Sequence, residues 1–269
     1  MTIRLGRQLA RGSRSAVHEW GAGAVAKVPF ASTPEGWIEF EGRYTAAVHS
    51  AGAPAPRLLG IELIGGRAAS IYERVEGGSM WDHLAAHPRS VARHAHTLVD
   101  LQSSLARLVP PVSLPRLGDR LGCKIADAAR MVAGPLADAA ASIPTTTAIG
   151  LCHGDLHPGN VILARRGPVL VDWFDVCRGD PLFDVARTAL LLRTIDHRRP
   201  PAHLGGTDPI VVDVMRGAYL AAVDDEVTPD HAVLDRWEAV ASVARIAEGV
   251  PSERLVAIWD AWRTGRADG

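Results

Sequence analysis

Short β-like patterns crowd the first 75 residues of this chain, and helical periodicity dominates most of the remaining sequence. Apolar runs broken by glycine and proline indicate the strands. When a run of strands precedes a run of helices, the two kinds of element segregate into an α+β fold. We therefore expect a small N-terminal antiparallel β-sheet lobe with one helix and a larger, mainly helical C-terminal lobe. The five predicted strands cover residues 4–9, 16–20, 24–28, 57–63 and 68–75.

One helix is predicted inside the strand-rich part, over residues 34–51, because apolar residues recur there at helical spacing and Gly52 follows them. Residues 79–143 are mainly helical by periodicity, with a proline-broken link at 110–115. Residues 194–209 carry prolines and glycines and are expected to form a flexible loop. The remaining predicted helices cover residues 208–223, 229–248 and 252–263.

A polar loop interrupts the apolar runs near the middle of the chain. It reads His153-Gly154-Asp155-Leu156-His157-Pro158-Gly159-Asn160, and the next apolar run ends at Asp172. Phosphoryl transfer from a nucleotide needs a carboxylate to accept a hydroxyl proton, and an amide and a second carboxylate to hold Mg²⁺. The spacing fits this chemistry. Asp155 would face the acceptor hydroxyl, while Asn160 and Asp172 would hold the metal.

A lone lysine stands in an otherwise apolar strand pattern. Only two of the 29 Lys and Arg residues are lysines, Lys27 and Lys124. Lys27 either extends to solvent at a strand edge or contacts phosphate in a cleft. Glu41 follows on the predicted helix. A charged side chain on a helix is usually solvated, but a glutamate that faces a cleft could pair with Lys27 and hold it toward the α- and β-phosphates.

Two backbone segments are candidates for contact with a nucleotide. The turn at residues 10–17 carries Gly12 and Ser13, whose small side chains would let the backbone approach phosphates, although a plain hairpin gives the same pattern. Residues 73–78 connect the strand-rich part to the helical part. Such a connector can bind adenine through backbone groups.

A turn leading into a helix is predicted after the second apolar run, at residues 178–180. Asp180 has the character of a helix N-cap, with Pro181 at the first helical position. Asp184 and Arg187 lie three residues apart on that helix. We expect them to pair with each other or to brace the polar loop.

Composition excludes several classes of protein. The net charge of -1 gives no reason to expect a nucleic-acid partner, and no run of about 18 uncharged apolar residues suggests a membrane span. The N-terminus lacks an apolar signal core, so a cytoplasmic location is expected. Three separated cysteines, Cys123, Cys152 and Cys177, predict buried thiols rather than a disulfide framework.

Together these motifs resemble the aminoglycoside phosphotransferase family of small-molecule kinases, which is similar in fold to protein kinases. The resemblance extends over about residues 5–190. It is carried by the polar loop, Lys27, the helix of Glu41, and three short segments: Pro54-Ala55-Pro56, Val171-Asp172-Trp173, and Gly179-Asp180-Pro181 with Asp184.

The resemblance implies a two-lobed protein-kinase-like fold, with a nucleotide-binding lobe over residues 1–75 and a catalytic and substrate-binding lobe over 76–269. It implies Asp155 as catalytic base, Asn160 and Asp172 as Mg²⁺ ligands, and His153 as a support for the loop. ATP, or GTP, would bind between the lobes and phosphorylate a small-molecule hydroxyl in a monomer or homodimer. The implied nucleotide contacts are Lys27, Glu41, Gly12, Ser13, Val17, Glu73 and Val75.

Departures from the protein-kinase pattern favour a small-molecule acceptor. Gly154 replaces the arginine that reads an activation-loop phosphate in those enzymes, and Trp173-Phe174 replaces the Phe-Gly after the metal aspartate. No Ala-Pro-Glu segment follows. Related kinases act on aminoglycosides, other antibiotics, amino sugars and similar metabolites, so the acceptor stays open.

Three other interpretations compete with a kinase. His153, Asp155 and His157 could ligate a transition metal in a hydrolase. Cys152 or Cys177 could act as a nucleophile beside His153, although a cysteine that ends an apolar run is typically a buried small hydrophobe. A catalytically inactive, kinase-like nucleotide-binding module is the third alternative, against which the complete set of polar residues argues.

Overall fold

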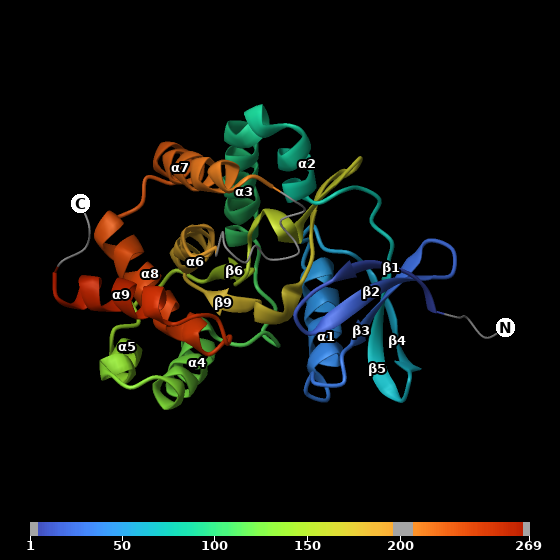
Figure 1. The fold of residues 1–269 in the computed structure, drawn as a ribbon, viewed down its shortest axis with the longest axis horizontal. Coiled ribbons are helices and arrows are strands. Elements are labelled where there is room, and N and C mark those ends of the chain that lie inside the picture. Colours follow the sequence, from blue (N-terminus) through green and yellow to red (C-terminus); the bar gives the residue numbers. More distant parts are fainter. Residues whose placement is uncertain (1–4, 196–206, 266–269) are drawn as a thin grey trace. The chain divides into compact units, whose positions relative to one another are not determined.

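The computed structural model describes residues 5–195 and 207–265 (Figure 1). The described chain divides into two compact units. The first contains residues 5–88, 158–175 and 207–208, and the second contains residues 89–157, 176–195 and 209–265. Most of the loop predicted over residues 194–209 lies outside the described residues.

An antiparallel five-stranded sheet forms the centre of the first unit, in the order β1-β2-β3-β5-β4. The five predicted strands are all present, with ends displaced by up to two residues. This confirms the predicted N-terminal sheet of an α+β fold. The strands are β1 (Leu5–Arg11), β2 (Ser15–Trp20), β3 (Ala24–Pro29), β4 (Leu58–Ile64) and β5 (Arg67–Glu73).

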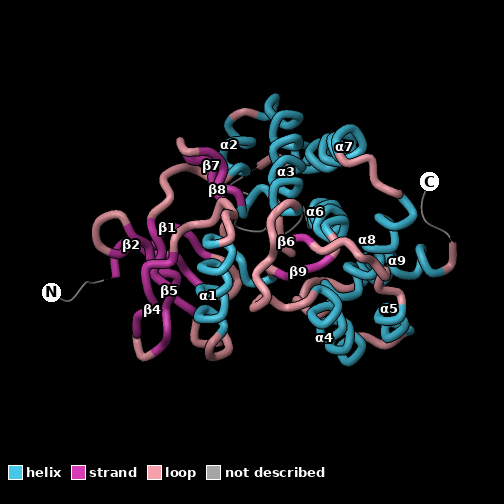
Figure 2. The backbone as a smooth tube through the Cα atoms, turned by 180° about the vertical axis from the view of Figure 1, so that it is seen from behind, coloured by secondary structure: helices cyan, strands magenta, loops and turns pink. Residues whose placement is uncertain are grey.

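Helix α1 (Trp37–Ser50) packs against the sheet through one face (Figures 1 and 2). It begins three residues later than predicted, because Gly36 takes a left-handed backbone (φ 77°) just before it, a conformation that glycine adopts without strain. Its buried positions recur at helical spacing: Ile38, Glu41, Gly42, Thr45 and Val48.

Helix α2 (Met80–Ala86) and the antiparallel hairpin of β7 (Val161–Ala164) and β8 (Gly167–Leu170) complete the first unit. Ser79 and Asp82 cap α2 reciprocally. The Leu163 N–H donates to the Gly78 carbonyl at 2.9 Å, and the Leu170 N–H donates to the Pro54 carbonyl at 2.7 Å. The segment with Asn160 and Asp172 is therefore hydrogen-bonded to the unit that holds the five-stranded sheet.

Helices build most of the second unit, around the nearly fully buried α6 (Pro181–Arg193), which contacts α3, α7 and α8. As predicted, Asp180 caps α6: its carboxylate accepts from the Leu182 N–H at 3.0 Å. It also accepts from the Trp237 indole N–H at 3.1 Å. The other helices are α3 (Val91–Ala106), α4 (Leu117–Met131), α5 (Asp138–Ala141), α7 (Pro209–Glu226), α8 (His231–Ile246) and α9 (Glu253–Arg263).

Two sequence predictions were wrong in this unit. Residues 177–179 form a short strand, β9 (Cys177–Gly179), paired antiparallel with β6 (Gly150–Cys152), where a turn was expected. Cys123 is exposed rather than buried, because the buried positions of α4, such as Leu121 and Ile125, lie on another side of the helix. The three cysteines are free thiols, as predicted.

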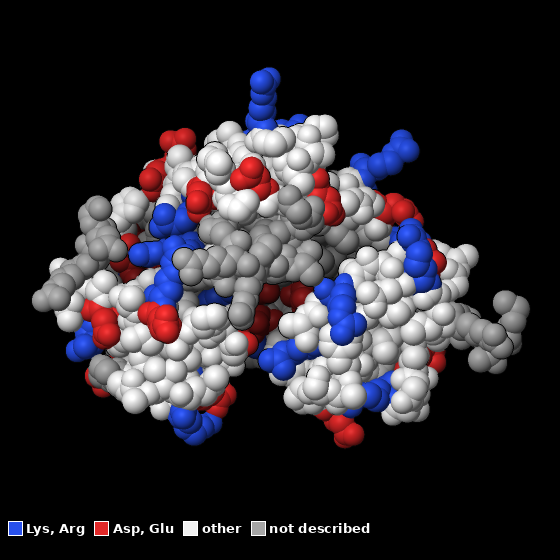
Figure 3. All heavy atoms as spheres, in the orientation of Figure 1, with Lys and Arg blue, Asp and Glu red and all other residues white. Residues whose placement is uncertain are grey.

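The surface carries both signs of charge. On the face drawn in Figure 3, acidic and basic side chains are interspersed over each unit, in agreement with the net charge of -1. Among the described residues, no helix is both long and apolar enough to cross a bilayer.

Candidate active site

A buried carboxylate of α6, Asp184, forms hydrogen bonds to the backbone of the first half of the polar loop. Asp184 accepts hydrogen bonds from the backbone N–H of His153 at 2.9 Å and of Gly154 at 2.7 Å. Burial raises the pKa of Asp184 to about 6, against the lowering effect of these two bonds and of Arg187. Gly154 has a left-handed backbone (φ 78°), which favours glycine. These bonds fix the backbone immediately before Asp155.

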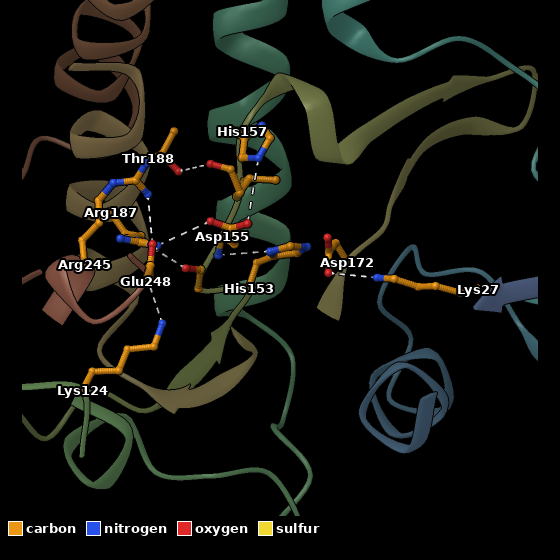
Figure 4. Close-up of polar contacts among 12 residues, drawn as sticks. Lys27, Lys124, His153, Asp155, His157, Asp172, Arg187, Thr188, Arg245 and Glu248 are labelled. Carbon is orange, nitrogen blue, oxygen red and sulfur yellow. Dashed lines mark hydrogen bonds and ion pairs between the residues drawn. The ribbon is translucent and has the colours of Figure 1, made fainter. Parts of the chain in front are cut away.

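Asp155 presents a partly exposed carboxylate, with 27% of its side chain accessible. One oxygen, Oδ1, lies 3.5 Å from Arg187 Nη2, and the other, Oδ2, lies 3.9 Å from His157 Nε2 (Figure 4). The buried His153 ring accepts from the Asp155 N–H at 3.3 Å through Nδ1. A carboxylate oriented by its neighbours and open to solvent can accept a proton from a bound hydroxyl.

A cluster of charges that the sequence did not predict lies next to Asp155. Arg187 donates from Nη2 to Glu248 Oε1 at 2.6 Å, and Glu248 also pairs with Lys124 and Arg245 (Figure 4). Burial alone would raise the pKa of Glu248, but the three cations outweigh it and hold that pKa well below its usual range. Two sequence signals were available, the expectation that Arg187 pairs with Asp184 or braces the polar loop and the rarity of lysine in this chain, but neither indicated Glu248.

In the first unit, Lys27 joins two carboxylates that are far apart in the sequence. From β3, its Nζ donates to Glu41 Oε1 of α1 at 2.6 Å and to Asp172 Oδ1 at 3.1 Å. Burial alone would lower the pKa of Lys27, but Asp172 and Glu41 raise it above its ordinary value. Burial raises the pKa of Glu41 to about 7 against the attraction of Lys27. Because Lys27 faces a second carboxylate as well, we treat it as a permanent cation.

Asn160 and Asp172 supply oxygen donors of the kind that Mg²⁺ prefers. Asn160 is buried at the end of a 3₁₀ turn (Pro158–Asn160), and Asp172 is 48% exposed at its side chain. Asp172 has a positive φ of 67°, which is unusual for a residue other than glycine. Among the described residues, no group of three His, Cys, Asp or Glu side chains forms a metal cluster.

The predicted phosphate turn joins β1 to β2 and is tied to the segment after Asp172 by a stack of side chains. The Arg14 guanidinium lies 4.2 Å from the centre of the Trp37 ring. Trp37 stacks on Phe174 with ring centres 3.7 Å apart and an angle of 8°. Gly12 and Ser13 are exposed in the turn. The stack fixes the turn to the first residues of α1.

The other predicted nucleotide contacts also lie in the first unit. Val17 pairs directly opposite Lys27 across β2 and β3, so both side chains are on the same face of the sheet. Glu73 ends β5 and forms an ion pair with Arg166 of the β7–β8 turn. Val75 follows in the connector and is half-buried.

The residues of the competing interpretations are placed less favourably for their chemistry. His153 is fully buried, and its Nδ1 accepts the Asp155 N–H. Cys152 is buried, and its thiol donates to the Asp180 carbonyl at 3.4 Å. Its pKa is raised well above the ordinary value, first by the neighbouring Cys177 thiol and then by burial. A buried thiol with a raised pKa is a poor nucleophile.

Comparison with known proteins adds an independent line of evidence. A sequence model described as the phosphotransferase enzyme family matches residues 6–209. The matched range contains the polar loop, Lys27, Glu41 and Asp172, and it ends where α7 begins. A search of curated proteins found no match.

Several solved structures share the fold. An aminoglycoside-3'-phosphotransferase of type VIII has a TM-score of 0.63 and 19% identity, over 90% of this chain and 93% of that chain. A thermostable mutant of aminoglycoside phosphotransferase APH(4)-Ia, solved with AMP-PNP and hygromycin B, has a TM-score of 0.62 and 19% identity, over 99% and 93%. The GDP complex of wild-type aminoglycoside 2'-phosphotransferase-IIIa has a TM-score of 0.59 and 16% identity, over 98% and 94%. At such low identity these likenesses establish the fold, and they confirm its predicted kinase-like class.

Proposed function

The chain belongs to the phosphotransferase enzyme family, and from that premise we propose that it transfers the γ-phosphoryl group of ATP to a hydroxyl of a small molecule. Membership confirms the predicted family and the predicted enzyme class, a small-molecule kinase. The observation that best supports the detailed proposal is the contact of Lys27 with both Glu41 and Asp172. A permanent cation fixed between two carboxylates is placed to hold a polyphosphate beside a metal.

The first unit would bind the nucleotide. Lys27 would contact the phosphates, and Glu41, almost fully buried, would keep the lysine in place. Asn160 and Asp172 would hold Mg²⁺, which when bound would neutralise charge on the phosphate oxygens. The Gly12–Ser13 turn and the connector with Glu73 and Val75 are the proposed backbone contacts to the phosphates and the base.

The second unit would supply the group that acts on the acceptor. Asp155 would accept a hydrogen bond from the attacking hydroxyl and take its proton as the bond to phosphorus forms. Asp155 and Asn160 belong to one continuous eight-residue loop of the sequence.

The acceptor is proposed as an aminoglycoside or other antibiotic, an amino sugar, or a related metabolite. One of the structures with this fold was solved with AMP-PNP and hygromycin B, and another with GDP. A screen of nucleotide consumption should therefore use ATP and GTP, each against aminoglycosides, peptide antibiotics, amino sugars, choline and hydroxy amino acids. We expect turnover with at least one acceptor that depends on Mg²⁺.

Asp155→Ala tests the catalytic assignment. Losing the proton acceptor should lower kcat by roughly 10²- to 10⁴-fold. Nucleotide affinity should remain close to that of the wild type, because Asp155 is not among the proposed nucleotide contacts. Asp155→Asn, which keeps the volume and removes the charge, should lose a similar factor. Wild-type turnover in both variants would exclude Asp155 as the base.

Two outcomes of the screen would favour the competing functions. Nucleotide binding without turnover of any acceptor would indicate an inactive binding module. Bound zinc after purification, with hydrolysis that needs no nucleotide, would indicate a metal-dependent hydrolase.

A further inference from the structure

Arg187 connects the loop of Asp155 to the C-terminal part of the second unit. Its Nε donates to the Gly154 carbonyl at 3.2 Å, and its Nη2 lies 3.5 Å from Asp155 Oδ1. The same Nη2 donates to Glu248 Oε1 at 2.6 Å, across 61 residues of sequence. The Arg187 side chain is only 4% exposed. One planar guanidinium therefore contacts the loop backbone, the candidate base and a distant carboxylate at once.

Glu248 is itself fixed from two further directions. Lys124 of α4 lies 3.0 Å from Oε1, and Arg245 at the end of α8 lies 3.2 Å from Oε2 (Figure 4). Both carboxylate oxygens thus have cationic partners. Lys124 is the second of the two lysines in the chain, and Glu248 lies beyond the residues 6–209 that match the family.

These contacts bear on the orientation of Asp155. A base must present one oxygen along the line of the acceptor O–H bond, and a displacement of about 1 Å can cost about 10²-fold in rate. Arg187 contacts Oδ1, while Oδ2 faces His157. Since Arg187 also bonds to the Gly154 carbonyl, its position fixes both the carboxylate and the preceding backbone.

We propose that Lys124, Glu248 and Arg187 form a positioning relay that orients Asp155 for the acceptor hydroxyl. The relay rests on the proposed function of Asp155 and adds three residues outside the polar-loop motif, of which Glu248 also lies beyond the matched family range. Glu248 touches no reacting atom in this scheme. It acts by holding Arg187, and Lys124 acts by holding Glu248.

Glu248→Gln tests the relay, because it keeps the size of the side chain and removes the charge that attracts Arg187. With the acceptor found by the screen, kcat should fall about 10- to 100-fold when expressed per nucleotide-binding site, and KM for the nucleotide should stay within about twofold. Amide hydrogen exchange over residues 151–157, measured without ligand, should become faster.

Glu238→Gln is the matched control. Glu238 is on α8, the helix that precedes the turn of Glu248, and like Glu248 it pairs with an arginine of α6, since Arg193 Nη1 lies 3.3 Å from its Oε1. That pair joins α8 to the last residue of α6, six residues beyond Arg187. The kcat of Glu238→Gln and its amide hydrogen-exchange rates over residues 151–157 should therefore match those of the wild type. Equal losses of kcat in Glu248→Gln and Glu238→Gln would show that any weakened contact of α8 or of the turn after it has this effect. That result would overturn the relay.

A double substitution, Arg187→Met with Glu248→Leu, covers the case in which the single variant does not fold. It removes the Arg187 cation together with Glu248, so Arg187 is not left buried without its main carboxylate. Lys124 and Arg245 each lose one carboxylate partner. Titratable and charged groups around Asp155 include His157 on the loop, Arg187 from α6 with Glu248 behind it, and Asp184 of α6, which accepts from the preceding backbone N–H and interacts with Arg187. Removing the cation should move the acid limb of the kcat–pH profile to higher pH, which a loss of folded protein alone would not do.

The outcomes of these experiments distinguish failure of the relay from failure of the proposed function. If the wild type turns over an acceptor while Glu248→Gln keeps the wild-type kcat and the wild-type amide exchange rates, the relay is overturned. The proposed kinase function is then unaffected. If the wild type turns over no acceptor, the proposed function fails, and the catalytic role of the relay fails with it. The exchange rates would then decide only whether the cluster holds the loop.

Discussion

Glu248 should contribute stability that depends on pH in a defined direction. Its carboxylate pKa falls from about 4.5 to about 2 in the folded protein, because the pull of three cations exceeds the effect of burial. Each unit of such a shift corresponds to about 1.4 kcal/mol, so the upper limit near pH 7 is about 3 kcal/mol. The Glu248 side chain is 22% exposed, and solvent screening reduces this to about 2–3 kcal/mol.

A depressed carboxyl pKa stabilises the folded state above the unfolded pKa, and the gain is lost as pH falls through the folded pKa. The free energy of unfolding of Glu248→Gln should therefore lie about 2–3 kcal/mol below that of the wild type at pH 7. The difference should shrink to about 1 kcal/mol at pH 3. This loss lies at or below the roughly 3–5 kcal/mol that removing one partner of a buried ion pair costs, because Arg187 stays buried in the variant but Glu248 itself is partly exposed.

Thermal and urea unfolding of wild type, Glu248→Gln and Glu238→Gln measure this directly. At pH 7 a loss of 2–3 kcal/mol should lower Tm by roughly 5–10 °C for a chain of this size. Glu238→Gln should lose less, since one arginine rather than three cations is recorded beside Glu238. A difference for Glu248→Gln below about 0.5 kcal/mol at pH 7, or one that grows toward pH 3, would refute the assignment of charges in this cluster.

Three further substitutions test the first unit. Gly42→Ala should lower the free energy of unfolding by about 1–2 kcal/mol in a urea titration, because the new Cβ would lie 2.5 Å from the Ser70 hydroxyl and overpacking outweighs the gain in helix propensity. Trp37→Ala should cost about 1–3 kcal/mol in the same titration and weaken nucleotide binding by calorimetry, since the stack on Phe174 is lost; unchanged values would show that the stack supports neither property. Asp172→Ala should abolish the Mg²⁺ dependence of nucleotide binding, and an unaltered Mg²⁺ titration would exclude Asp172 as a ligand.

The sheet and its helix were predictable because their signals are local. Alternating apolar residues, glycine punctuation and the Asp180–Pro181 cap act within a few residues, and the structure follows them. The strand β9 was missed because Arg178-Gly179-Asp180 has turn composition, while its extended form comes from pairing with β6, 27 residues earlier. A strand this short is determined by its partner rather than by its own residues.

The residues of the candidate site differ in the same way: some carry a local sequence signal and others do not. The polar loop and Lys27 were recognisable from residue type and spacing, since carboxylates and a lysine within apolar patterns are unusual. Glu248 gave no such signal, because a glutamate near the end of an amphipathic helix is typically solvated. Its role depends on contacts with residues 61 and 124 positions away. Helical or strand periodicity describes neighbours within a few residues, so it cannot predict contacts between residues 61 or 124 positions apart.

The proposed relay gives the turn after α8 a role in the orientation of Asp155. The matched family range contains Asp155, Asp184 and Arg187, yet it ends before Glu248, the closest recorded anionic partner of the Arg187 side chain. Without α8 and the turn after it, Arg187 would lose its shortest ion pair, while the Gly154 carbonyl and the Asp155 and Asp184 carboxylates would still interact with it. A buried cation in that position would draw closer to the candidate base and compete with the acceptor hydroxyl for its oxygens. On this reasoning Glu248 restrains Arg187 at 3.5 Å from Asp155, close enough to orient the carboxylate and far enough to leave it available to a substrate.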